Sequence, residues 1–256
     1  MDDVLGGSVD RPACGDCRGG IAAPFEFSMA FQPVVDIEAG VVEGYEALVR
    51  GPQGQPASDV LGRVTRSNRY AFDQSCRVKA ITLASGLGLT AQGGYLSINF
   101  IPGAMYRPEH CIGATLAATR RTGFPQDRLV FELTENERID DFAHLHSIIR
   151  TYRENRFRTA FDDFGMGYSG LGMLAAFQPD RVKVDMALVR GIDGDARRGI
   201  IMGGIVGICR SLKIELVAEG IETRGEMSAL RDLGVRHMQG YLFARPAFER
   251  LPVVVF

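Results

Sequence analysis

The chain has 256 residues, of which 46% are hydrophobic and 23% charged, a composition typical of a globular protein with a substantial core. Its net charge is −2 and its longest basic runs are Arg120-Arg121 and Arg197-Arg198, so we expect no binding to duplex DNA. No apolar run approaches the roughly 20 residues of a membrane helix. The first residues, Met1-Asp2-Asp3, do not begin a secretory leader, which has a basic segment followed by an apolar one. The sequence therefore predicts a cytoplasmic protein without a membrane segment.

The N-terminal region differs in composition from the rest of the chain. Residues 1–24 are rich in Gly and Asp, and we expect them to form a flexible tail before a single domain at 25–256. The tail contains Cys14 and Cys17 in a CxxC motif without a second ligand pair for zinc. We interpret these thiols as incidental, with metal or redox chemistry as the alternative. Cys76, Cys111 and Cys209 lie in helical patterns and are expected to act as small apolar residues.

Short apolar runs then alternate with longer amphipathic ones. The runs predict eight strands, at Met29–Val35, Gly44–Arg50, Tyr95–Ile101, Leu129–Thr134, Thr159–Phe164, Arg181–Asp185, Ile214–Ala218 and His237–Phe243. Helices are predicted at Asp59–Ser85, Ile112–Thr122, Ile139–Asn155, Arg197–Leu212 and Glu226–Leu233, the last preceded by a capping-box pattern at Thr223. The alternation is typical of an α/β fold, a TIM (β/α)8 barrel.

The first connection departs from a regular barrel. Only about eight residues, centred on 36–40, separate the first two predicted strands. A parallel crossover needs a dozen or more residues, so we expect the first strand to run antiparallel to the second. The sequence therefore predicts a modified barrel.

Polar residues interrupt the apolar strands or follow them directly. They are Glu46, Asn99, Glu132, Asp162, Asp163, Lys183, Glu219 and Gln239. In a barrel of this class the carboxyl ends of the strands meet at one mouth, so these side chains are expected to converge there. Each one alone is better explained by a solvated strand end. Seven strands with the same feature favour a site, because unpaired buried charge is costly.

The expected set is rich in oxygen ligands and has no Cys or His, which favours a hard divalent cation, Mg²⁺ or Mn²⁺. Two cations a few ångströms apart would compensate the adjacent Asp162 and Asp163, hold a phosphodiester and activate water for in-line attack. Lys183 suits a place beside that water or the phosphate oxygens. The alternative for Lys183 is an ion pair with Asp185.

Seven spaced motifs resemble those of the EAL-domain phosphodiesterases of bacterial cyclic di-GMP signalling. They are EALVR at 46–50, SINF at 97–100, FELTE at 131–135, DDFGMGYSG at 162–170, KVD at 183–185, AEGIET at 218–223 and QGYLFARP at 239–246. The resemblance runs from about Phe25 to the C-terminus. It implies hydrolysis of cyclic di-GMP to linear pGpG with two Mg²⁺ or Mn²⁺ ions.

The resemblance also implies individual roles. Glu46, Asn99, Glu132 and Asp162 would bind the first metal, with Asp162 bridging to a second that Asp163 also binds. Lys183 would contact the attacking water, Glu219 would be a second-site ligand or a base-like group, and Gln239 would position water or substrate. Gln32 and Arg50 lie where family members touch the substrate.

The loop after Asp163 carries two further expectations from the family. It would link the metal site to a homodimer interface formed by nearby helices, with Glu135 anchoring the loop. A plain strand-to-helix turn explains its glycines equally well. Met166 and Gly170 depart from the usual residues of the loop without removing a ligand.

The complete ligand set favours an active enzyme acting in signal transduction. The runner-up is a catalytically silent domain of the same fold that acts as a cyclic di-GMP receptor or docks an unidentified regulatory protein. Hydrolysis of the dinucleotide by the purified protein distinguishes these two functions.

Overall fold

The computed structural model describes residues 23–256 apart from positions 106, 135–141, 166–169 and 255. The predictions for the N-terminal tail and for Cys14 and Cys17 lie outside this part of the chain. The strands are β1 (Ser28–Asp36), β2 (Val41–Arg50), β3 (Tyr95–Asn99), β4 (Leu129–Thr134), β5 (Arg158–Phe164), β6 (Arg181–Val184), β7 (Glu215–Ala218), β8 (His237–Met238) and β9 (Ala247–Phe248). The longer helices are α2 (Arg69–Gly86), α5 (Gly113–Thr122), α6 (Phe142–Glu154), α9 (Ala196–Leu212) and α10 (Arg224–Asp232).

The described strands form one sheet that closes on itself. Its order is β2-β3-β4-β5-β6-β7-β8-β1-β9, and an additional pairing of β1 with β2 completes an eight-stranded barrel. β1 runs antiparallel to both of its barrel neighbours, β2 and β8, with Ser28 opposite Arg50 and Asp36 opposite Val41 in the pairing with β2. The successive pairs from β2 to β8 are parallel. The predicted modified barrel is therefore confirmed.

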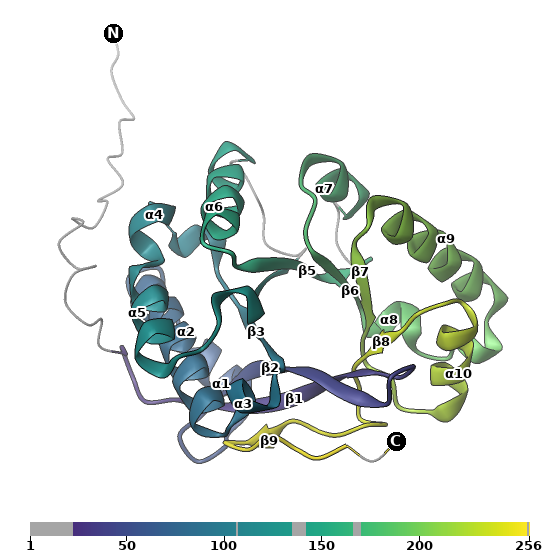
Figure 1. Ribbon diagram of the computed structural model, residues 1–256, viewed down its shortest axis with the longest axis horizontal. Coiled ribbons are helices and arrows are strands. Elements are labelled where there is room, and N and C mark those ends of the chain that lie inside the picture. Colours follow the sequence, from purple (N-terminus) through teal and green to yellow (C-terminus); the bar gives the residue numbers. More distant parts are fainter. Residues whose placement is uncertain (1–22, 106, 135–141, 166–169, 255) are drawn as a thin grey trace, which may run out of the picture.

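Helices cover most of the outside of the barrel, while β9 and the C-terminal segment run along β1 (Figure 1). All nine residues of β1 are buried, since one face of this strand lines the barrel interior and the other is covered. Leu145, Ile148 and Ile149 are the buried stripe by which α6 packs. The predicted capping box is present: Thr223 and Glu226 satisfy the first N–H groups of α10.

The structure corrects several predicted element bounds. The single helix predicted at Asp59–Ser85 is two, α1 (Ala57–Leu61) and α2, because Asn68 bonds the backbone of Thr65 and Arg63 between them. β8 ends at Met238 instead of Phe243, since a Cβ on Gly240 would meet the carbonyl oxygen of Ile221 at 2.1 Å, an approach only glycine allows.

Shorter elements were not predicted from the sequence. They are β9, α3 (Leu89–Gln92), α4 (Pro108–Cys111), α7 (Gly170–Ala176), α8 (Met186–Val189) and the 3-10 turns η1 (Pro102–Ala104), η2 (Gln126–Arg128) and η3 (Ile192–Gly194). Most of these have four residues or fewer, too short for a hydrophobic period to show.

Two composition-based expectations can be compared with the described residues. Cys76, Cys111 and Cys209 are buried, as expected of small apolar residues. Across the described ranges, we find no helix with the length and hydropathy needed to cross a membrane.

Candidate active site

The predicted polar residues converge at the carboxyl ends of the strands. Glu46 lies on β2, Asn99 ends β3, Glu132 lies on β4, Asp162 and Asp163 lie near the end of β5, and Lys183 lies on β6. Glu219 follows β7 directly and Gln239 follows β8. A cavity of about 280 Å³ opens here, and its walls include Gln32, Glu46, Asp162, Asp163, Lys183, Glu219 and Gln239.

Lys183 is the centre of this cluster. Its Nζ lies 2.8 Å from Glu132 Oε2 and 2.8 Å from Glu219 Oε1, and 3.2 Å from both Glu46 Oε2 and Asp162 Oδ1. Its side chain is 3% exposed. Asp185, the alternative partner, instead caps α8 by accepting from Ala187 N at 2.7 Å. The structure thus places Lys183 inside the site.

Burial and like charge govern the pKa values of the cluster. Burial opposes the charge of Lys183, but the surrounding carboxylates outweigh it and raise the pKa of the ammonium well above its usual value. Burial raises the pKa of Glu132 to about 8, and it raises the pKa values of Asp162 and Glu219 as well. One ammonium cannot neutralise four carboxylates, so ionisation of the whole set requires further positive charge.

The backbone of β5 turns both adjacent aspartates toward the cavity. Successive residues of a regular strand point to opposite faces, which would separate Asp162 from Asp163. The pairing of β5 with β6 is irregular between Phe161 and Phe164, and Asp163 has φ +55°. Aspartate tolerates this left-handed conformation better than most residues. Burial and the neighbouring Asp162 raise the pKa of Asp163 to about 6.

Amide side chains connect one side of the cluster. Gln239 Nε2 donates to Glu46 Oε2 at 2.8 Å and to Gln32 Oε1 at 3.2 Å. Asn99 Nδ2 donates to Glu46 Oε1 at 3.0 Å. The Oε1 atom of Gln239 is buried and has no hydrogen-bond partner among the described residues, so it is an acceptor free for a water or a ligand.

The carboxylates also meet the geometric requirement for cations. One ligand atom from each of Glu46, Glu132 and Asp162 lies within 4.8 Å of the others, and the same holds for Asp162, Asp163 and Glu219. Asp162 belongs to both groups, as a bridging ligand would. An all-oxygen set with excess negative charge fits Mg²⁺ or Mn²⁺.

One predicted residue in the described part of the chain is not brought into this cluster. Arg50 is half-buried, does not line the described cavity, and donates from Nη1 to Val49 O at 2.7 Å. Glu135 lies outside the described residues.

Several cavity residues were missed by the sequence reasoning. Met186, Arg190, Glu222 and Tyr241 line the mouth, and Arg190 pairs with Glu222 through its two terminal guanidinium nitrogens, Nη1 and Nη2. Each follows a strand end by two to six residues. That position was a usable signal, because residues just beyond a strand line the same mouth.

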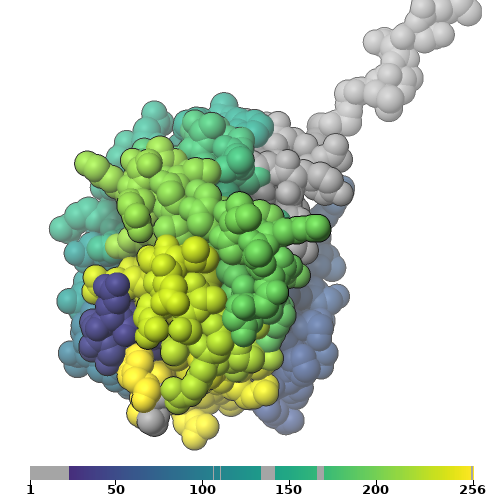
Figure 2. Space-filling view, turned by 90° about the vertical axis from the view of Figure 1, so that its right-hand side faces the viewer, coloured from purple at the N-terminus to yellow at the C-terminus, as the bar shows by residue number. Residues whose placement is uncertain are grey.

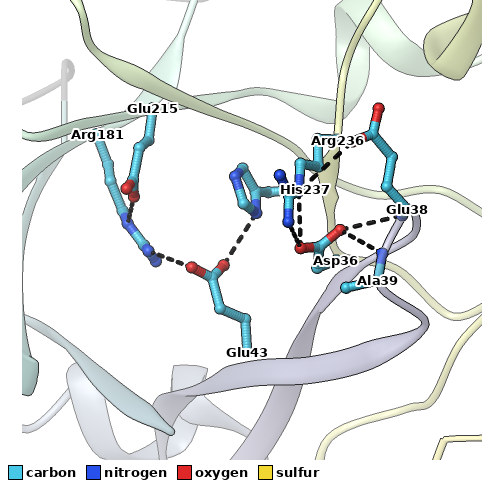
Figure 3. A network of polar contacts seen from close by, with 8 residues as sticks. All are labelled: Asp36, Glu38, Ala39, Glu43, Arg181, Glu215, Arg236 and His237. Carbon is cyan, nitrogen blue, oxygen red and sulfur yellow. Dashed lines mark hydrogen bonds and ion pairs between the residues drawn. The ribbon is translucent and has the colours of Figure 1, made fainter.

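A second ionic network lies at the other end of the barrel (Figure 3). Arg181, which begins β6 and is 2% exposed, donates to Glu43 Oε1 at 2.8 Å and to Glu215 Oε2 at 2.6 Å. His237 Nδ1 lies 3.0 Å from Glu43 Oε2, so His237 belongs to this network. Arg236 and Asp36 form a neighbouring pair.

The fold and the acidic mouth define a barrel protein with a candidate divalent-cation site. The family model described as EAL domain matches residues 21–246, and the chain belongs to this family.

Relatives of known structure share the fold closely. A standalone versatile EAL protein from Vibrio cholerae O395, solved in its c-di-GMP-bound form, is 50% identical, with a TM-score of 0.87 over 91% of this chain and 98% of that one. The manganese/cy-diGMP complex of Klebsiella pneumoniae BlrP1 is 34% identical, with a TM-score of 0.84 over 91% of this chain and 59% of BlrP1.

Among curated relatives, the probable cyclic di-GMP phosphodiesterase PdeG of Escherichia coli (strain K12) is 30% identical over 229 residues. The match covers 84% of this chain and 44% of PdeG. The chain spans about half the length, or less, of the curated relatives that it matches.

Proposed function

We propose that the chain is a metal-dependent phosphodiesterase that hydrolyses one phosphodiester of cyclic di-GMP to give linear pGpG. The observation that carries this proposal is the buried excess of carboxylates around Lys183, arranged as two groups that share Asp162. The Vibrio cholerae relative solved with c-di-GMP and the name of PdeG support the same substrate.

The carboxylates would hold two Mg²⁺ or Mn²⁺ ions. Glu46, Glu132 and Asp162 would bind the first, together with Asn99 once its amide oxygen faces the ion. Asp162, Asp163 and Glu219 would bind the second. Ions bound there would polarise the phosphodiester and lower the pKa of a bound water. The manganese complex of BlrP1 supports a divalent cation in this family.

The chain's own polar groups would orient the reactants. Lys183 holds the four carboxylates in place and would contact the attacking water, while its charge stabilises negative charge on the phosphate oxygens. The free Oε1 of Gln239 would accept a hydrogen bond from that water. Gln32 would contact the substrate beside Gln239. Arg50 would bind a phosphate once its guanidinium no longer donates to the Val49 carbonyl.

We also propose a homodimer formed through α7 and α9, the helices after β5 and β6. Leu171 on α7 is 62% exposed, and Ile200 and Ile201 on α9 are 76% and 50% exposed. Figure 2 shows the face to which α9 contributes beside α10. Large exposed apolar side chains on neighbouring helices are typical of a protein interface. The anchoring role of Glu135 and the cytoplasmic location stay predictions.

A turnover assay tests the function. Purified protein incubated with cyclic di-GMP and Mn²⁺ or Mg²⁺ should release pGpG, and a chelator should stop the reaction. Asp162→Asn removes the carboxylate common to both groups and should reduce turnover to background, with Asp36→Asn at the other end of the barrel as a control. Absence of pGpG with either metal would contradict the proposal.

The runner-up is a receptor that binds cyclic di-GMP without cleaving it. One observation favours it: Lys183 already compensates part of the acidic cluster without a metal. Tight nucleotide binding in the presence of chelator, with no hydrolysis when metal is added, would establish this second function.

A further inference from the structure

Helix α2 carries two opposite charges on the face that packs against the barrel. Asp73 is 2% exposed and Arg77 is 0% exposed, and Asp73 Oδ2 lies 2.7 Å from Arg77 Nη2, one helical turn away. A buried ion pair of this kind is no more stabilising than apolar side chains of similar volume. Packing alone therefore gives no reason for charges at these two positions.

The aspartate end of the pair is bonded to the chain as it leaves β3. Asp73 Oδ1 accepts a hydrogen bond from Ile101 N at 2.9 Å, two residues beyond Asn99. The intervening Phe100 N donates to Glu132 O at 3.1 Å. The carboxylate of Asp73 thus fixes the backbone segment on which Asn99 stands.

The arginine end lies among aromatic rings. The guanidinium carbon of Arg77 is 5.6 Å from the ring centre of Phe100, 5.2 Å from that of Phe131 and 5.9 Å from that of Tyr152. Its Nη1 donates to the Tyr152 hydroxyl at 2.8 Å. A cation over several ring faces in a dry site is held more firmly than one in water.

The rings connect Arg77 to the site. Phe100 follows Asn99 along the chain, and Phe131 precedes Glu132. Neighbouring residues of a strand point to opposite faces, so the rings pack outward on Arg77 while Glu132 points inward to Lys183. Asn99 and Glu132 are also register partners in the β3–β4 pairing.

We propose that Asp73 and Arg77 are positioning residues, which hold Asn99 and Glu132 in place for the cation site from the outer side of the barrel. This inference rests on the proposed function, since it concerns residues proposed to bind the first metal. Partners that orient metal ligands from behind typically change metal affinity or activity 10- to 100-fold when they are removed.

A double variant separates positioning from stability. Asp73→Leu combined with Arg77→Met removes the pair without leaving an unpaired buried charge, but Ile101 N and the Tyr152 hydroxyl each lose a partner. The thermal unfolding midpoint should therefore fall, but by less than in either single variant, which would leave one buried charge unpaired. Calorimetric titration with Mn²⁺ should show binding about 10- to 100-fold weaker, and kcat should fall with little change in KM. A matched double variant, Asp36→Leu with Arg236→Met, removes an ion pair at the other end of the barrel and should leave Mn²⁺ binding unchanged.

The outcomes distinguish this inference from the proposed function. A folded double variant that binds Mn²⁺ and turns over like the wild type overturns the positioning role alone, whereas a wild type without Mn²⁺ binding or turnover overturns the function. If the double variant does not fold, Arg77→Lys gives the same readout, because it keeps the charge but loses the fork that spans Asp73 and Tyr152. Weaker Mn²⁺ binding by Arg77→Lys supports the inference, and unchanged binding refutes it.

Discussion

Arg181 and Lys183 stand two residues apart on β6 and belong to separate ionic networks at opposite ends of the barrel. Arg181 pairs with Glu43 and Glu215, while Lys183 pairs with carboxylates that end the strands. β7 repeats the arrangement, with Glu215 at its start and Glu219 just past its end. The barrel interior thus has two charged layers. The surroundings of the two cations differ, because the Arg181 guanidinium lies over the Tyr95 ring, whereas the Lys183 ammonium faces an excess of carboxylates.

The two layers should respond differently to divalent cations. Lys183→Met leaves four carboxylates without their ammonium, so the metal-free variant should lose about 3–5 kcal/mol of stability, and a bound cation should restore much of it. Arg181→Met should lose a similar amount with no restoration, because its partners Glu43 and Glu215 belong to neither of the two carboxylate groups that could hold a cation. Thermal unfolding with and without Mn²⁺ measures both. Equal Mn²⁺ shifts in the two variants would contradict the assignment of separate layers.

The sequence was sufficient to predict the architecture because strand burial and connection length are local. The eight apolar runs, the short link before β2 and the capping box at Thr223 each depend on neighbouring residues. β8 was predicted too long because its end is set by a contact distant in sequence, between Gly240 and Ile221 O. No hydrophobic pattern records such a contact.

The sequence was sufficient to predict which residues form the site, but not how their side chains are oriented in it. Polar residues at strand ends indicated which side chains meet, since strand ends converge in a barrel. The turn of Asp163 into the cavity depends on an irregular β5–β6 pairing and a positive φ, which the sequence does not express. Arg50 has the residue type for phosphate binding, but in this structure it bonds the backbone of Val49.

The Asp36–Arg236 pair should give the protein a defined acid sensitivity. The hydrogen bond from Arg236 lowers the pKa of Asp36 from 3.8 to about 2, against the opposing effect of burial. A carboxyl whose pKa is lower in the folded state contributes stability above its unfolded pKa, and this contribution disappears as pH falls from about 4 to about 2. Because Arg236 is half-exposed, solvent screening limits the contribution to about 1 kcal/mol.

Asp36→Asn should therefore be about 1 kcal/mol less stable than the wild type at pH 7, with a difference that closes as pH approaches 2. Urea unfolding at pH 7, 4 and 3 measures it. Asp232→Asn, at a surface carboxylate 3.7 Å from Arg231, is a matched control and should change little at any pH. A gap between Asp36→Asn and wild type that stays constant with pH would show that the charge of Asp36 is not the source of the stability difference.

Asp163 allows a test of the second cation group without disturbing the backbone. Asn tolerates positive φ nearly as well as Asp and removes a carboxylate whose pKa is raised by burial and by Asp162, so metal-free Asp163→Asn should be at least as stable as the wild type at pH 7. It loses a carboxylate of the second group only, so Mn²⁺ stoichiometry by calorimetry should fall from two ions to one and turnover should fall at least about 100-fold. Asp163→Val, with a branched side chain at the same φ, should be destabilised as well. Two bound ions in Asp163→Asn would exclude this carboxylate as a ligand.

The exposed apolar side chains of α9 make the proposed homodimer testable by charge. Ile200→Glu places a carboxylate where 76% of the side chain is open, so the monomer should lose little stability, but burial of that charge in an interface is costly. Sedimentation across a concentration series should show the wild type as a dimer. In Ile200→Glu the dissociation constant of the dimer should rise at least about tenfold, which corresponds to about 1.4 kcal/mol. Val253→Glu, at a side chain 87% exposed near the C-terminus, is the control and should dimerise like the wild type. A wild type that sediments as a monomer at all concentrations would refute the dimer, and an unshifted Ile200→Glu would place the interface elsewhere.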